Sequence, residues 1–369
     1  MNKFICPYCY GEHDLRTTSM KCSFNIQGQS GMTCVGNVQK EPGGFIPQKD
    51  KVRCTKCTAA KKIYFCDVVK KEIPREFLED PNGFSVALVG AKASGKSNYI
   101  GVLIQEIKKK MVPRFNCSLS LTTSEESKMY YDRMYYKPLY ENGVVVDATN
   151  KGAAIPPLIF PLRFWEKKGA KSTAVLTFYD TAGENLDRDS DMLVNTRYIP
   201  NASGIILLLD PLQVPAIREK LQGKMPLPEQ NTDTVEVLSR LVENIRSVKN
   251  IRGKIKTPLA LAFTKIDALA EFDILGEDSV LREESQHLHR GVFAQPDFES
   301  VNIEIRDMLG SFLGGEIEQM LKNFETYAFF GLSSLGGIPQ GRIDIKPCRV
   351  LDPLLWLLAQ RGYIPKAKK

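Results

Sequence analysis

The fold is decided by the stretch Gly90-Ala91-Lys92-Ala93-Ser94-Gly95-Lys96-Ser97, which follows an apolar run over residues 84–89 and opens a helix-like segment. The stretch matches G-x-x-x-x-G-K-[ST], the pattern of a nucleotide phosphate loop. Its glycines allow backbone N–H groups to curl around phosphate oxygens, while Lys96 supplies a point charge and Ser97 a hydroxyl for Mg²⁺. A glycine turn without a ligand is the alternative, but it does not require a hydroxylated residue after the lysine. The expected nucleotide contacts are Gly90, Lys92, Ser94, Gly95, Lys96 and Ser97.

Length and composition describe an ordinary globular protein. With 369 residues the chain exceeds the usual size of one domain, which predicts one large domain with insertions or two unequal ones. Its 43% hydrophobic and 25% charged residues argue against disorder. The net charge of +7 is spread among acids, so it permits nucleic-acid binding without indicating it. No apolar run is long enough for a bilayer and the N-terminus lacks a signal-peptide core, so we expect a cytoplasmic protein without membrane contact.

Cysteines concentrate before the phosphate loop. Seven of the nine lie there, namely Cys6, Cys9, Cys22, Cys34, Cys54, Cys57 and Cys66. Two C-x-x-C pairs beside an intracellular nucleotide motif favour Zn²⁺ over disulfides, because each pair presents two thiolates to one tetrahedral ion. A small segment with little core would gain folding energy from that ion.

The sequence leaves the zinc ligands open between two groupings. The first choice joins Cys6 and Cys9 with Cys54 and Cys57 in a ribbon-like four-cysteine site. The alternative joins Cys6, Cys9, Cys22 and Cys34. It leaves Cys54, Cys57 and Cys66 to a second site without an obvious fourth ligand, since Val69 stands where a C-x-x-C partner of Cys66 would be. His13 could serve in either site, and a leftover cysteine could be a buried free thiol.

We expect two domains that meet near residue 80. Residues 1–80 form the cysteine-rich zinc-binding domain, and the turn Pro81-Asn82-Gly83 leads into an α/β domain over 81–369 with a mainly parallel sheet. The expected strands are 85–90, 158–164, 174–179, 204–210, 259–264 and 327–332. The expected helices are 97–111, 234–248, 301–324 and 353–361.

Three later segments complete a guanine-nucleotide pattern. The strand at 174–179 runs into Asp180-Thr181-Ala182-Gly183, where Asp180 can hold Mg²⁺ through water and the Gly183 N–H can meet the γ-phosphate. The strand at 259–264 leads into Thr264-Lys265-Ile266-Asp267. There a carboxylate can accept hydrogen bonds from guanine N1 and N2, while the lysine stem lies along the ring. Adenine offers no such pair of donors. After the last strand, the backbone of Ser333 and Ser334 can meet the guanine oxygen.

These four motifs, in this order, resemble those of the Ras-like GTPases of the TRAFAC class. The resemblance implies a P-loop NTPase fold, a Ras-like G domain, with insertions near 112–157 and 211–256. A looser resemblance, carried by the cysteine-rich leader and the ending Pro347-Cys348-Arg349-Val350-Leu351-Asp352-Pro353-Leu354-Leu355-Trp356, is to the bacterial double-GTPase families of predicted conflict systems.

The chain departs from the Ras-like pattern in three places. Glu184 stands where a water-orienting glutamine is common, which predicts slow hydrolysis or an altered base. Lys92 replaces a frequent glycine; it can reach the γ-phosphate or remain a solvated lysine. Ser334 replaces the alanine of S-A-x, a mild change. For the switch threonine we favour Thr149, with Thr122 and Thr123 as rivals, and the expected catalytic set is Lys96, Glu184 and Thr149.

The expected function is a GTP-binding switch and slow GTPase that uses GTP/GDP, Mg²⁺ and Zn²⁺. Its zinc unit would dock a protein partner, as activator or effector, or nucleic acid. A P-loop ATPase and a non-hydrolysing nucleotide-binding scaffold are the alternatives.

Two other groups of residues favour structural roles. Five tyrosines within 128–140 at helical spacing predict core packing, with a partner-binding face as the alternative. His287 and His289 stand two apart, so we expect both at the surface. Asp210, after the strand at 204–210, is expected to cap the strand end.

Overall fold

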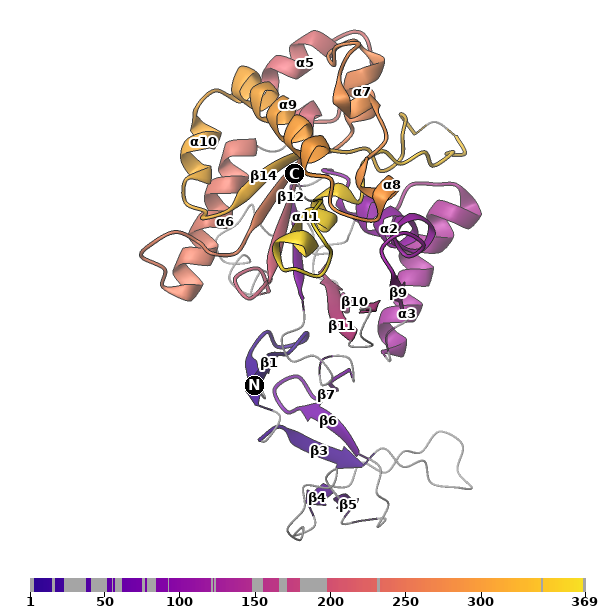
Figure 1. Ribbon diagram of the computed structural model, residues 1–369, viewed down its shortest axis with the longest axis vertical. Coiled ribbons are helices and arrows are strands. Elements are labelled where there is room, and N and C mark those ends of the chain that lie inside the picture. The colour runs from indigo at the N-terminus through magenta and orange to yellow at the C-terminus, as the bar shows by residue number, and fades with distance from the viewer. Residues whose placement is uncertain are drawn as a thin grey trace. The chain divides into compact units, whose positions relative to one another are not determined.

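The computed structural model describes residues 3–14, 17–22, 38–40, 52–54, 56, 62–74, 77, 84–91, 93–120, 122, 124–147, 155–165, 171–179, 198–230, 233–339 and 341–367. Within it the chain forms two compact units, Met1–Gly83 and Phe84–Lys369 (Figure 1). Each unit is described by itself.

The described residues of the first unit form short antiparallel strands and turns. Strand β1 (Lys3–Ile5) pairs with β2 (Glu12–Asp14), and β4 (Val38–Lys40) pairs with β5 (Val52–Cys54). A three-stranded sheet has the order β3-β6-β7, with β3 at Ser19–Cys22, β6 at Lys62–Cys66 and β7 at Lys71–Glu72. Among the described residues of this unit, few apolar side chains are fully buried.

A four-stranded parallel sheet is the centre of the second unit. Its order is β14-β13-β12-β8, with β8 at Val86–Gly90, β12 at Gly204–Leu209, β13 at Leu259–Phe263 and β14 at Tyr327–Gly331. Every residue of β8, β12 and β13 is buried. Parallel strands covered on both faces have such continuous apolar sequences, which is why the sequence marks them clearly.

An antiparallel sheet lies next to this parallel one. Its order is β11-β10-β9, with β9 at Cys117–Leu119, β10 at Leu158–Trp165 and β11 at Lys171–Phe178, and β11 lies beside β8. Leu158 faces Phe178 in the β10–β11 register. The fold is therefore the mixed α/β arrangement of a P-loop NTPase, as predicted.

Helices connect and cover the strands (Figure 1). They are α2 (Lys96–Glu106), α3 (Glu125–Tyr131), α5 (Pro215–Leu221), α6 (Thr234–Lys249), α7 (Ile266–Glu271), α8 (His287–Arg290), α9 (Gln295–Leu313), α10 (Glu316–Leu321) and α11 (Asp352–Gln360). Short 3₁₀ turns occur at η4 (Pro211–Gln213) and η5 (Val280–Arg282). No helix in the described part of the chain has the length and apolarity to span a bilayer.

One predicted helix is wrong. Instead of a single helix over 301–324, α9 starts earlier and ends before Gly314, and α10 follows Gly315. The break occurs because Gly314 has a φ of +68°, a left-handed conformation that glycine adopts without strain.

Two helices continue as π-helices. Helix α2 runs into η1 (Ile107–Met111), and α3 runs into η2 (Asp132–Asn142), which contains most of the tyrosine-rich segment. Tyr131 and Tyr135 are buried, and the Tyr131 hydroxyl donates to the Gly101 carbonyl and accepts from Gln105 Nε2. Tyr130, Tyr136 and Tyr140 are partly buried and pack against the same core, so the prediction of core packing is confirmed.

Candidate nucleotide site

The phosphate loop connects β8 to α2. Strand β8 ends at Gly90 and α2 begins at Lys96, with Ala93 at φ +63° and Gly95 at φ +84° between them. A Cβ on Gly90 would lie 2.5 Å from Ser94 Oγ and 3.2 Å from the Leu208 carbonyl oxygen. The loop therefore closes tightly over its own strand, and the two glycines of the motif allow its shape.

The described part of this loop fits a phosphate group. The Ser94 hydroxyl oxygen is buried and has no hydrogen-bond partner among the described residues. Lys96 is buried in the first turn of α2, where the helix dipole favours an anion. Gly95 precedes the helix without a capping side chain. A buried polar oxygen, a lysine and an uncapped helix start are a suitable donor set for phosphate oxygens, and the Ser97 hydroxyl lies next in the chain for Mg²⁺.

The Thr264-Lys265-Ile266-Asp267 segment joins β13 to α7. The Thr264 backbone N–H and hydroxyl both donate to the Leu209 carbonyl, at 2.9 and 3.2 Å, which ties the segment to the end of β12. Lys265 has a φ of +52° and precedes the helix. The half-buried Asp267 lies in the first turn of α7.

Asp210 directly follows β12 and makes two separate contacts. Its Oδ1 accepts from the Leu212 N–H at 2.9 Å, which confirms the predicted cap. Its Oδ2 accepts from Lys265 Nζ at 2.6 Å, and only 1% of the Asp210 side chain is exposed. Sequence reasoning missed this ion pair. The available signal was an acid placed directly after a fully buried strand that is parallel to the one before Lys265.

The segment after β14 is held by the chain near Cys348. Ser333 and Cys348 exchange backbone hydrogen bonds of 3.0 and 2.9 Å, and Ser333 Oγ accepts from the Gly336 N–H at 2.9 Å. Gly336 has a φ of +80°, and a Cβ there would collide with the Lys346 carbonyl oxygen. Ser334 is half-buried beside this turn. The turn thus has a fixed backbone.

Three predicted motifs follow strands of one parallel sheet. The phosphate loop follows β8, Thr264 follows β13 and Ser333 follows β14, so all three lie at the carboxyl edge, where open α/β sheets bind ligands. A hydrogen bond from the Ile266 N–H to the Leu332 carbonyl links the last two segments.

Other predicted site residues fall elsewhere. Lys92, Thr123, Thr149, Asp180, Gly183 and Glu184 lie outside the described residues. Thr122 is buried, and its hydroxyl accepts from the Ser124 N–H at 3.1 Å just before α3. That side chain therefore has a local structural contact.

The cysteine-rich unit brings together a set that differs from both groupings considered from sequence. Cys6, Cys9, His13 and Cys66 place one ligand atom each within 4.8 Å of one another. Cys54 is buried but does not belong to this group, and its sulfur accepts from the Lys56 N–H. Cys34 and Cys57, and the side chain of Cys22, lie outside the described residues.

The expectation that His287 is a surface residue is wrong. The side chain is buried, its Nδ1 accepts from the Ala294 N–H at 2.9 Å, and its ring stacks on Phe293 with centroids 4.5 Å apart. Because α8 is only one turn long, the chain folds back at once and covers one side of it. His289 is exposed, as expected.

Near His287 lies a buried charge cluster centred on Arg349. Its guanidinium donates to Asp297 Oδ1 at 3.0 Å, to Asp352 Oδ2 at 3.0 Å and to the Val280 carbonyl at 2.9 Å. These carboxylates raise the pKa of Arg349 against the opposing effect of burial. The arginine supplies the positive charge of this group, which ties α9, η5 and the start of α11 together.

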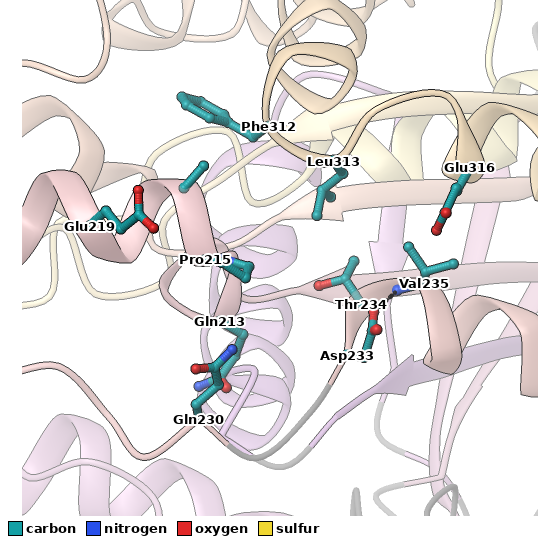
Figure 2. Close-up of a pocket in the computed structure, with 11 residues that line it drawn as sticks. Gln213, Pro215, Glu219, Gln230, Asp233, Thr234, Val235, Phe312, Leu313 and Glu316 are labelled. Carbon is teal, nitrogen blue, oxygen red and sulfur yellow. Dashed lines mark hydrogen bonds between the residues drawn. The ribbon is translucent and has the colours of Figure 1, made fainter.

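A cleft of about 650 Å³ lies apart from the predicted nucleotide residues. Figure 2 shows side chains of α5, the start of α6 and the end of α9 around it. Asp233 on its wall already caps α6 by accepting from the Val235 N–H at 2.8 Å. None of the residues predicted to contact nucleotide lines this cleft.

Comparison with known proteins supplies a family and several similar proteins. The family described as "Double-GTPase 2" matches residues 85–313. The "Putative ESX-1 scaffolding and assembly protein SaeC" of Mycolicibacterium smegmatis (strain ATCC 700084 / mc(2)155) is 26% identical over 351 residues, covering 88% of this chain and 87% of that protein.

Solved structures are similar over most of the chain at low identity. The Arl6 BBS3 small GTPase from Trypanosoma brucei with bound GppNp has a TM-score of 0.32 and 12% identity, over 76% of this chain and 99% of that one. The Ski7 GTPase-like domain of S. cerevisiae bound to GDP and inorganic phosphate has a TM-score of 0.36 and 15% identity, over 78% and 51%.

Proposed function

Because this chain belongs to the double-GTPase 2 family, we propose that it is a GTP-binding protein that acts as a nucleotide-dependent switch. The observation that carries the proposal is the common placement of the phosphate loop, the Thr264 segment and the Ser333 turn at the carboxyl edge of one parallel sheet. We propose that this edge binds phosphate after β8 and the guanine base after β13 and β14, because open α/β sheets bind ligands at the carboxyl ends of their strands.

Each residue has a role that its chemistry supports. Lys96 neutralises charge on the β- and γ-phosphates, and the Ser94 hydroxyl donates to a phosphate oxygen. Ser97 and Asp180 hold Mg²⁺, whose charge offsets that of the phosphates. Gly183 senses the γ-phosphate, with Thr149 as the switch threonine. Asp267 selects guanine, Lys265 lies along the base, and the Ser333–Ser334 backbone meets the guanine oxygen.

Hydrolysis is expected to be slow without a partner. Catalysis of phosphoryl transfer depends mostly on positioning and charge stabilisation, and Glu184 replaces the glutamine that orients water in Ras-like proteins. A carboxylate beside a polyanion is repelled, so we propose that a protein activator completes the site. The presence of Glu184 in place of glutamine also favours a second candidate function, a scaffold that binds GTP without hydrolysing it.

A protein partner is also supported by the named relative. Since the mycobacterial protein is called a putative scaffolding and assembly protein, we propose that this chain assembles with other proteins and that bound nucleotide controls the assembly. Affinity capture of the chain loaded with GTP or GDP, followed by mass spectrometry, tests this idea. Equal capture in both states contradicts nucleotide control.

The first experiment compares Mg²⁺-dependent phosphate release and nucleotide binding for GTP and ATP, with Lys96→Ala as the blank. GTP should bind at least tenfold more tightly than ATP, and Asp267→Ala should remove that preference. Asp278→Ala is the matched control, because Asp278 is an exposed aspartate outside the motif. Equal ATP binding that Asp267→Ala leaves unchanged would favour an ATPase. Tight GTP binding without release, even with captured partners, would favour the scaffold.

A further inference from the structure

A second candidate site, made of cysteine and histidine side chains, lies in the cysteine-rich unit. Cys6 and Cys9 come from the turn after β1, His13 lies in β2, and Cys66 ends β6. The Cys9 sulfur is 3.2 Å from His13 Nε2, and the Cys66 sulfur is 3.8 Å from the same nitrogen. Two separate strand pairs therefore direct soft ligands to one point.

We propose that Cys6, Cys9, His13 and Cys66 bind one Zn²⁺ ion in a tetrahedral site. With Zn–S bonds of about 2.3 Å and Zn–N bonds of about 2.0 Å, ligand atoms of a tetrahedron lie roughly 3.5 to 3.8 Å apart. The four ligand atoms here all lie within 4.8 Å of one another. Small shifts of the side chains would bring them to bonding distance around a shared ion.

The backbone prepares this site. The Tyr10 N–H donates to the Cys6 carbonyl and the Cys6 N–H donates to the Gly11 carbonyl, both at 3.0 Å, so the chain turns sharply between the two cysteines and β2. Tyr10 has a φ of +60° in this turn. Phe4 faces His13 in the β1–β2 register, and their stacked rings lie 5.5 Å apart. That stacking holds the imidazole in one orientation. The side chain therefore loses less conformational entropy when it binds a metal ion.

The ligand set identifies the kind of ion. Three thiols cannot all pair with one another as disulfides, and the structure has Cys6, Cys9 and Cys66 as free cysteines. Thiolates with one imidazole in a tetrahedral arrangement are typical of structural zinc sites. Cys6 and Cys66 are fully buried and Cys9 and His13 are half-buried, and together these four side chains would complete the coordination of one tetrahedral ion. The ion would stabilise a unit in whose described part few apolar side chains are buried, and this role is independent of the proposed nucleotide switch.

The proposed site explains how Cys66 can be a zinc ligand although it belongs to no C-x-x-C pair. Cys66 has no C-x-x-C partner, because its hairpin places Val69 at that position. In the proposed site, His13 is the ligand that a C-x-x-C partner of Cys66 would otherwise supply. Its register opposite Phe4 depends on strand pairing, which the spacing of cysteines does not reveal.

The test uses the full chain purified without chelator, with zinc measured per chain by mass spectrometry. His13→Ala and Cys66→Ser should each lower the content by one equivalent. His289→Ala and Cys348→Ser are matched controls outside the cluster and should leave it unchanged. Wild-type protein without zinc, or full zinc in both cluster variants, would overturn the proposal.

A second measurement guards against variants that fail to fold. His13→Cys keeps four ligands but changes the donor set from three sulfurs and one nitrogen to four sulfurs. In cobalt-substituted protein this change should keep the metal and move the visible d–d bands to longer wavelength, as a thiolate replaces an imidazole. A cobalt spectrum identical to that of the wild type would show that His13 is not a ligand.

Discussion

Lys265 Nζ lies 2.6 Å from Asp210 Oδ2, so the lysine of the proposed base-recognition segment is bound to the acid that directly follows the neighbouring strand β12. The ion pair joins the segment after β13 to the segment after β12. Its carboxylate is shielded from water, because only 1% of the Asp210 side chain is exposed. Asp210 is thereby suited to hold the lysine stem in one orientation before nucleotide arrives.

Asp210→Asn should weaken GTP binding about fivefold, on the order of 1 kcal/mol, because the NH2 group that replaces Oδ2 cannot accept from Lys265 Nζ and the ion pair is lost. The amide oxygen can still accept from Leu212, so the melting temperature should change little. Titration with a fluorescent GDP analogue measures the affinity. Asp233→Asn, at an exposed cap that accepts from Val235, is the control. Unchanged affinity in Asp210→Asn would show that the lysine needs no such support.

Gly336→Ala should destabilise the Ser333 turn and weaken GTP binding. Its Cβ would meet the Lys346 carbonyl oxygen, and its positive φ disfavours alanine by about 1 kcal/mol in addition. Gly337→Ala is the matched control, because a Cβ there meets nothing within 4 Å. GTP titration measures the affinity of both variants, and thermal unfolding measures their stability. Equal behaviour of the two would mean that the backbone of this turn is not constrained in solution.

Arg349→Ala should lower the free energy of unfolding by about 3–5 kcal/mol, the usual cost of leaving buried carboxylates without their counter-charge. Asp297 and Asp352 both depend on this guanidinium. Chemical denaturation measures the loss. Arg306→Ala, which breaks an exposed pair with Asp307, should cost less than about 1 kcal/mol. Similar losses in the two variants would contradict the buried cluster.

Burial raises the pKa of the Cys117 thiol to about 12. Since the folded pKa lies above the unfolded one, near 8.5, the thiol's contribution is fully present below pH 8.5 and is lost as pH rises toward 12. Wild-type stability should therefore fall more steeply than that of Cys117→Ala above pH 8.5, by up to about 1.4 kcal/mol per pH unit. Denaturation at several pH values gives both slopes. Parallel slopes would place the thiol in contact with water.

The predictable part of the fold came from long, strong patterns. Strands β8, β12 and β13 are unbroken apolar runs, and α6 has clear helical periodicity with Asp233 as its cap. Strand β9 escaped notice because three residues carry no periodicity, and it exists through pairing with β10. The α9–α10 break was marked in sequence by Gly314-Gly315, yet the apolar pattern on both sides outweighed it.

Within the candidate sites, local motifs were predictable and long-range pairings were not. The phosphate loop and the Thr264 segment follow from residues close in sequence. The Asp210–Lys265 pair and the approach of His13 to Cys66 each join residues more than fifty positions apart. His287 was misjudged for the same reason, because the residues that bury it belong to the chain after the next turn.

Two backbone contacts bear on the order in which the protein is synthesised. They are the hydrogen bonds between Ser333 and Cys348 and the close approach of Gly336 to Lys346. The turn that would meet the base is translated before the residues that fix its backbone. The backbone contacts that hold this turn therefore cannot form until residues 346–348 have been made, whereas the phosphate loop is made much earlier. If the Ser333 turn meets the base as proposed, a chain that lacks residues 346–348 should bind GTP less tightly than the full chain, although it already contains the phosphate loop.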